Sequence, residues 1–291
     1  MIARLSCLIL LCFSLLPSLA RAQGVTTGPI DEVLERSGQK TGDVYKVSFP
    51  RSDLHVSVRG LAIKPGFALG SWAAFLGTDD KAMVMGDLVL LEGELNPVIA
   101  KLRSAGFDIS AVHNHLMEES PRVLYSHYMG HGPAKQLAAS LRAALALSKT
   151  PLEKPAAATE EAAPAWVKTV EDAVGRKGTF KGGVLSYGVA RSDAITVGGM
   201  TIPPAAGVAE AINFQAADSG NVATTGDFVL NAEEVNPVIS ELQRHQISVT
   251  ALHSHMLTEQ PRLFFMHFWS VGNPEAVGGG IKAALSRIAV K

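Results

Sequence analysis

Three histidines recur in the same arrangement at two places in the chain. The first set is His113, His115 and His127, and the second set is His253, His255 and His267. In each set a His-x-His pair is followed by a third histidine twelve residues later. Zinc is commonly held by three imidazole nitrogens, which leave a fourth position for water or a substrate. The spacing therefore predicts one metal site in each set, with Zn²⁺ as the first candidate and copper as the alternative.

The ordinary alternative is that these histidines are core or surface residues with no ligand. Most aligned positions differ between the two parts of the chain, yet all three histidines recur. The other histidines do not recur, because His55, His131 and His245 align with Ile195, Val271 and Ala105. Burying three imidazoles without partners would also be costly. The selective recurrence favours ligands over packing residues.

Carboxylates accompany each histidine set. Glu119 and Glu259 follow the second histidine by four residues in both places. We expect each to act as a fourth ligand, as the partner of a ligand N–H, or as a general base, and a solvated loop carboxylate is the alternative. Asp87 and Asp227 also recur beside a glycine at the start of an apolar run, where a turn role is as well supported as a functional one.

The chain is one unit written twice. Ile30–Leu145 aligns without gaps with Val170–Leu285, at an offset of 140 residues. A repeat of this length is a tandem duplication of a domain rather than a solenoid. The predicted parts are a signal peptide at 1–22, a first copy at 23–147, a solvated linker rich in Ala, Pro and Glu at 148–165, and a second copy at 166–291.

Each copy mixes strands and helices. The segments 109–116 and 123–129 read as strands, and their antiparallel pairing would bring the third histidine beside the first two. The equivalent first strand of the second copy spans 247–257. Asn96 is expected to cap a helix that begins at Pro97, because Asn favours the N-cap and Pro the first helical position. The fold class is therefore α+β, a tandem duplication of one mixed-sheet domain.

The N-terminus and the composition limit where the protein works. Residues 1–22 have an early arginine, an apolar run and a small-residue site, which predicts cleavage between Ala22 and Gln23. The mature chain would then be periplasmic or secreted, without a membrane span, and it would lose both Cys7 and Cys12. The formal net charge of −1 argues against nucleic acid as a partner. The sequence predicts no oligomeric state.

A resemblance to known families is carried by the recurring segments. These segments are Gly86–Leu90, Glu94–Val98 and His113–Leu116 in the first copy, and Gly226–Leu230 and Pro261–His267 in the second. Together they resemble a bacterial domain-of-unknown-function family that includes the LppY/LpqO-type lipoproteins. That resemblance implies no activity, and this chain lacks a suitably placed cysteine for lipidation.

The histidine motif alone is also similar to the zinc motif of the acetolactate decarboxylases. This likeness implies an acetolactate decarboxylase-like fold and zinc ligation by both histidine sets. The decarboxylases keep one metal site, whereas this chain retains the motif twice.

Two classes of function follow from the sequence. The first is an exported Zn-dependent hydrolase or lyase that acts on a small carbonyl or ester substrate, with Glu119 or Glu259 moving a proton. The second is a non-catalytic protein that binds Zn or Cu, or a ligand-binding protein in which the metal is structural. An open coordination position beside a cleft favours the enzyme.

Overall fold

The computed structural model describes residues 24–153 and 161–291. The predicted signal peptide and the middle of the predicted linker lie outside these residues. No helix of the described part is long and apolar enough to cross a membrane.

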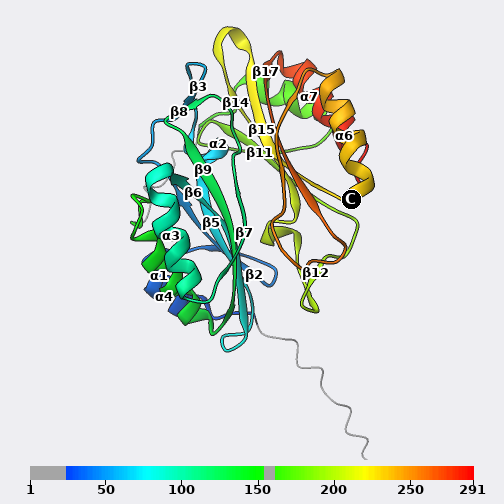
Figure 1. Cartoon of the computed structure of the whole chain (residues 1–291). Coiled ribbons are helices and arrows are strands. Elements are labelled where there is room, and N and C mark those ends of the chain that lie inside the picture. The colour runs from blue at the N-terminus through cyan, green and yellow to red at the C-terminus, as the bar shows by residue number, and fades with distance from the viewer. Residues whose placement is uncertain (1–23, 154–160) are drawn as a thin grey trace, which may run out of the picture.

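The two copies share the order of their main elements (Figure 1), but in the described residues the second copy has no strand equivalent to β8, has a 3-10 turn in place of α2 and has one further 3-10 turn. The first copy contains α1 (Thr27–Leu34), β1 (Gln39–Thr41), β2 (Val44–Pro50), β3 (Ser57–Val58), β4 (Leu61–Ala62), α2 (Pro65–Ala68), β5 (Gly70–Gly77), β6 (Ala82–Leu91), α3 (Glu92–Ser104), β7 (Asp108–His113), β8 (Glu119–Ser120), β9 (Val123–Gly132) and α4 (Ala134–Leu145). The second copy contains α5 (Ala165–Val174), β10 (Thr179–Lys181), β11 (Val184–Ala190), β12 (Thr196–Val197), β13 (Met200–Thr201), a 3-10 turn (Pro204–Ala206), β14 (Ala209–Ala216), a second 3-10 turn (Asp218–Gly220), β15 (Val222–Leu230), α6 (Ala232–Arg244), β16 (Ser248–His253), β17 (Phe264–Gly272) and α7 (Pro274–Leu285).

Each copy is built on a six-stranded sheet. The strand order is β1-β2-β5-β6-β9-β7 in the first copy and β10-β11-β14-β15-β17-β16 in the second. Every pairing within the two sheets is antiparallel, so the expected mixed sheet is wrong, whereas the expected α+β duplication is confirmed. β9 lies between β6 and β7 and pairs antiparallel with both, so the chain crosses from β6 to β7 through helix α3.

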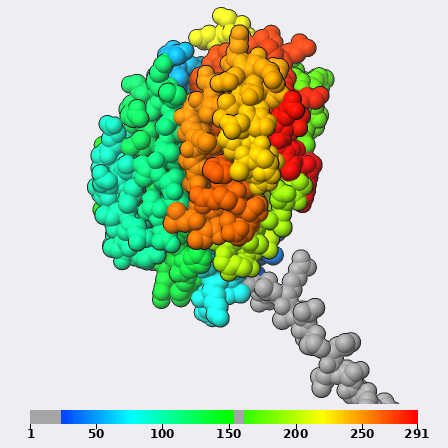
Figure 2. All heavy atoms as spheres, turned by 45° about the vertical axis from the view of Figure 1, so that its right-hand side comes forward, coloured from blue at the N-terminus to red at the C-terminus, as the bar shows by residue number. Residues whose placement is uncertain are grey.

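The sheets lie face to face, and the helices cover their outer faces (Figure 1). Side chains of β6 show this arrangement directly. Val84 and Leu88 belong to the core beneath the helices of the first copy, whereas Met83 and Met85 pack with Ile195 and Phe265 of the second copy. The strand is therefore apolar on both faces, which explains why its sequence does not alternate. In the space-filling view the copies meet along a long seam (Figure 2).

The strand registers revise the gap-free alignment of the copies. Trp72 of β5 lies opposite Asp87, and Ala211 of β14 lies opposite Asp227. The structural counterpart of Trp72 is therefore Ala211, one position away from the sequence pairing. The offset is 139 residues along β5 and returns to 140 in β6. The segment between β11 and β14 is one residue shorter than the segment between β2 and β5, and the turn after β14 is one residue longer than the turn after β5. These two differences cancel, so an alignment without gaps does not reveal the shift.

Helix α3 begins earlier than Pro97, so the predicted start is wrong. The helix starts at Glu92, and Pro97 lies inside it. The cause is Glu94, whose carboxylate accepts a hydrogen bond from the Leu91 amide at 2.9 Å and closes the first turn. The same glutamate also holds buried Arg51 at 2.8 Å, and the second copy repeats this ion pair.

The start of the predicted linker is fixed to the first copy rather than solvated. Arg36 donates hydrogen bonds to the carbonyl groups of Pro151 and Glu153. Thr150 is buried. The chain therefore stays packed on the first copy up to the last residue described before the gap.

Candidate metal centre

Each histidine set is positioned by an edge strand and its neighbour. His113 is the last residue of β7, and His127 lies in β9 opposite Ala111. His115 lies in the bend beyond β7, so the expected single strand over 109–116 is too long. The second copy repeats this layout, with β16 ending at His253. The bend, rather than the two-residue period of a strand, directs the second histidine toward the first.

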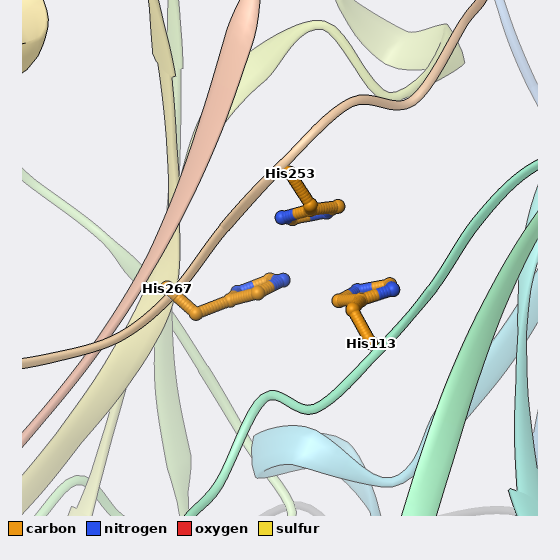
Figure 3. A group of neighbouring side chains, drawn as sticks. All are labelled: His113, His253 and His267. Atoms are coloured by element: carbon orange, nitrogen blue, oxygen red, sulfur yellow. The ribbon is translucent and has the colours of Figure 1, made fainter.

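The six histidines form one cluster between the two sheets. His113 and His253 stack at the centre, with ring centroids 3.8 Å apart. Other histidines of the first copy also lie beside histidines of the second copy. Figure 3 shows His113 of the first copy facing His253 and His267 of the second. The sequence grouped the histidines by copy, but the described structure brings both predicted sets into the same place.

The cluster has approximate two-fold symmetry. The His115–His267 and His127–His255 centroids are both 3.7 Å apart. The His113–His267 and His127–His253 separations are both 5.3 Å. These pairs exchange when the copies are exchanged, so the pseudo-axis passes through the central His113–His253 stack.

Backbone carbonyls fix the third histidine of each copy. The Nδ1 atom of His127 lies 3.2 Å from the carbonyl oxygen of Gly86, and that of His267 lies 2.8 Å from the carbonyl oxygen of Gly226. An imidazole that donates Nδ1–H in this way presents Nε2 as a metal ligand. The glycines are required, because a Cβ atom would lie 2.0 Å from the Trp72 oxygen at Gly86 and 2.1 Å from the Ala211 oxygen at Gly226.

Hydroxyl groups hold the second histidine across the interface. Ser110 donates to the carbonyl oxygen of His255 at 2.5 Å, and Thr250 donates to the carbonyl oxygen of His115 at 2.7 Å. Ser110 and Thr250 are equivalent positions of the two copies. Each copy therefore positions the His-x-His segment of the other.

Asp87 and Asp227 belong to the cluster, a role that the sequence left undecided. An Asp87 oxygen lies 3.2 Å from Nε2 of His115, and an Asp227 oxygen lies 2.9 Å from Nε2 of His255. Burial and the negative charge of Asp227 raise the pKa of Asp87 well above its usual range. The pairs Gly86-Asp87 and Gly226-Asp227 recur in the sequence. A glycine beside an aspartate is also typical of a turn, so the recurrence alone does not identify a functional residue.

Glu119 and Glu259 occupy a different place. Each is buried and accepts a hydrogen bond from the backbone four residues later, Glu119 from Val123 at 3.4 Å and Glu259 from Leu263 at 3.1 Å. Arg262 lies 3.3 Å from Glu259. These contacts close the loop before β9 and β17. Neither glutamate joins the described ligand groups or lines the cavity beside them.

Five imidazoles of the cluster are held in their neutral form. Burial, with repulsion from neighbouring rings, lowers the pKa of His113 to about 2. The same causes lower the pKa values of His115, His127 and His253, and burial lowers that of His267. A neutral imidazole has a free nitrogen lone pair, which is the form that binds a metal.

Several buried polar atoms of the cluster have no hydrogen-bond partner. They are Nδ1 of His113 and His253, Nε2 of His255 and His267, and one oxygen each of Asp87 and Asp227. Nε2 of His255 lies 2.9 Å from an Asp227 oxygen, but no hydrogen bond joins the two atoms. Orphaned buried polar atoms are costly unless an ion or water satisfies them.

The donor atoms fit a divalent transition metal. Three groups each bring three ligand atoms within 4.8 Å of one another, and they are His113, His253 and His267; His127, His253 and His255; and Asp87, His113 and His115. The Nε2 atoms of His113 and His115 are 3.1 Å apart, and those of His127 and His253 are 3.3 Å apart. Tetrahedral zinc with Zn–N bonds of about 2.0 Å separates its ligands by roughly 3.3 Å. Two of the three groups draw ligands from both copies.

A cavity of about 400 Å³ opens beside the cluster. It is lined by His115, His127, His255 and His267 together with Asp87 and Asp227. The central pair His113 and His253 lies outside the lining. Side chains of the cluster therefore face a space large enough for a small molecule. Catalytic metal sites have such an open side, whereas structural metal sites are closed.

The fold and the cluster define a tandem-duplicated α+β protein with a histidine–aspartate centre shared by its two copies. The model of the Domain of Unknown Function (DUF1259) family matches residues 28–147 and again residues 168–287. The chain belongs to this family, and the double match confirms the internal duplication. Neither the curated proteins nor the solved structures contain a match.

Proposed function

We propose that this protein is an exported metal-dependent enzyme whose single composite centre is assembled by both copies. Zinc is the proposed ion, and a small carbonyl or ester compound is the proposed substrate class. The observation that carries the proposal is a set of unpaired buried imidazole and carboxylate atoms beside a cavity of about 400 Å³. The ligands are the six histidines of the cluster, with Asp87 and Asp227 as ligands or direct partners.

The residues of the centre divide into two roles. Zinc held by imidazoles would supply Lewis-acid chemistry at a carbonyl or ester oxygen. Asp87 and Asp227 line the cavity, and burial raises the pKa of Asp87, so this carboxyl group can carry a proton to or from a substrate there. Placement favours these aspartates over Glu119 and Glu259, the proton carriers expected from the sequence. The likeness of the histidine motif to acetolactate decarboxylases supports a lyase as one of the two reaction types.

A non-catalytic zinc or copper protein is the second candidate. The observation that favours it is the number of imidazoles, because six nitrogen donors crowd a space in which one catalytic zinc needs about three. Export rests on the N-terminal sequence and is part of both proposals.

Elemental analysis of the purified full chain, prepared without a histidine tag, tests the metal. We expect at least one zinc ion for each chain, and copper in its place supports the second candidate. Turnover of esters, 2-oxo acids and 2-hydroxy acids is then measured before and after chelation. Activity that is lost on chelation and restored by zinc supports the enzyme. A metal-free protein contradicts both candidates.

A further inference from the structure

One end of the cavity carries a lysine that the metal cluster does not use. Lys46 projects from β2 into the cavity with Ser48 and Pro50, whereas the alternate residues of this strand belong to the helix-side core. It is the one lysine or arginine among the described residues that line this cavity. No described carboxylate lies within ion-pair distance of its ammonium group. Burial lowers the pKa of Lys46 to about 8, so the charged form still predominates at neutral pH and is available to a ligand.

An aromatic ring holds Lys46 in place. The ammonium nitrogen lies 4.1 Å from the ring centroid of Trp72, which lines the same cavity. Trp72 in turn packs on Gly207, where a Cβ atom would lie 2.5 Å from the indole. The carbonyl oxygen of Gly207 lies 3.2 Å from Nδ1 of His255. The lysine is thus built into the wall that also orients a histidine of the cluster.

This charged end is present in one copy only. The counterpart of Lys46 is Ser186, since these residues lie opposite Ala74 and Asn213 in equivalent strand pairs. The counterpart of Trp72 is Ala211. The histidines obey the pseudo-two-fold symmetry, but Lys46 and Trp72 break it. A ligand with one charged end would therefore bind in one orientation.

We propose that the cavity binds a small monocarboxylate, with its carboxylate paired to Lys46 and its other end facing the histidine–aspartate cluster. The inference rests on the proposed metal centre and names the substrate class for it. Lys46 supplies the one cationic side chain among the described residues of this lining. A single carboxylate matches that one positive charge, whereas phosphate groups carry nearly two negative charges at neutral pH.

Calorimetric titration of the zinc-loaded full chain with butyrate and butyramide tests the inference, because the two probes share a shape and differ in charge. We expect wild type to prefer butyrate at least about tenfold, and Lys46→Met to lower butyrate affinity at least about tenfold, as for a buried charged hydrogen bond. Butyramide affinity should change less than about twofold. Lys46→Arg should retain the preference, and Lys101→Met, an exposed change on α3, should match wild type.

Equal binding of the two probes by wild type overturns the proposal, as does an unchanged preference in Lys46→Met. Tighter binding of inorganic phosphate than of butyrate overturns the carboxylate class. Zinc content is measured on the same samples. A zinc-free wild type counts against the metal centre itself. A zinc-loaded wild type that does not prefer butyrate to butyramide counts against this inference alone. If Lys46→Met does not fold, the wild-type preference and Lys46→Arg decide.

Discussion

At the scale of single residues, Asp87 and Asp227 distinguish this cluster from a simple group of imidazoles. Each carboxylate is held close to the second histidine of its own copy and faces the cavity. A carboxylate beside a ligand imidazole raises the basicity of that ligand and orients its ring. In the proposed centre the two aspartates would therefore raise the metal affinity whether or not they touch the ion.

Replacing Asp87 by Asn should weaken zinc binding about 10- to 100-fold, because the amide removes the charge beside His115 while preserving the shape. Competition with a chelator of known affinity measures the change. Asp108→Asn is the matched control, since Asp108 lies on the surface, 2.9 Å from Arg103. Equal zinc affinity of Asp87→Asn and wild type would show that the carboxylate takes no part in the centre.

Metal-free protein should lose stability as the pH falls below about 6.5. The pKa of His113 is lowered to about 2 in the folded state, so only the unfolded state gains its proton between these values. Above the unfolded value both states are neutral, and the stabilising contribution is fully present. The free energy of unfolding should decline by up to about 1.4 kcal/mol for each pH unit from this residue.

Denaturant unfolding of chelator-treated protein at several pH values between 4 and 7 measures this slope. His113→Gln removes the titrating group and should give a shallower slope than wild type. Identical slopes would mean that His113 is not held neutral in the folded protein.

Sequence reasoning found the histidines but not their carboxylate partners. The histidines stood out because three of them recur together while three others do not. Asp87 and Glu119 both recur, so repetition could not separate a residue at the centre from one that closes a loop. The two residues differ in where their side chains lie. Asp87 lies on the face of β6 that meets the other sheet, whereas Glu119 accepts a backbone hydrogen bond outside the cavity.

At the scale of the elements, β6 and β15 link the fold to the centre. Each supplies an aspartate to the cavity and a glycine carbonyl to the third histidine. The close approach of Trp72 and Ala211 at these glycines keeps the strands tightly paired. A side chain at either glycine would disturb both the sheet and the ligand orientation.

Gly86→Ala should lower the free energy of unfolding by about 1–3 kcal/mol, the usual range for overpacking, because the new methyl group meets a backbone oxygen. It should also weaken zinc binding, since His127 depends on the Gly86 carbonyl. Gly93→Ala is the control, because nothing lies within 4 Å of that position in α3, and it should be neutral or slightly stabilising. Denaturant unfolding compares the two, and equal effects would contradict the packing argument.

Most strands could be predicted from apolar patterning, whereas helix starts and strand ends could not. The predicted strand over 123–129 lies within β9, whereas the strand predicted over 247–257 contains the shorter β16. The predicted start of α3 is wrong because Pro97 is typical of a first helical position, whereas the first turn is in fact closed by the carboxylate of Glu94. The strand predicted over 109–116 is too long because the bend at His115 depends on contacts with the other copy, including the hydrogen bond from Thr250.

At the scale of the whole molecule, the proposed metal centre lies at the interface that joins the two copies. Two of the three ligand groups contain histidines from both. An ion bound there would therefore connect two sheets that are otherwise held by apolar packing and by hydrogen bonds such as those of Ser110 and Thr250. Sequence alone could not show this, because which histidines meet depends on how two separate sheets pack, and the offset of 140 residues suggested two equal, independent sites.

Zinc should stabilise the chain as one unit. At a free zinc concentration 100 times the dissociation constant, the free energy of unfolding should rise by about 2.7 kcal/mol. We expect a single thermal transition that moves upward with zinc and returns with chelator. A transition that shifts for only part of the chain, or no shift at all, would contradict a centre shared by both copies.

The most direct test of the shared centre is the zinc content of His253→Ala after equilibration with a chelator that leaves wild type loaded. His253 belongs to both ligand groups that cross between the copies. A shared centre predicts that this one substitution removes zinc from the whole chain. Two independent sites predict that His113, His115 and His127 keep their own ion, so His253→Ala would retain half of the wild-type zinc at wild-type affinity, and that result would contradict the shared centre.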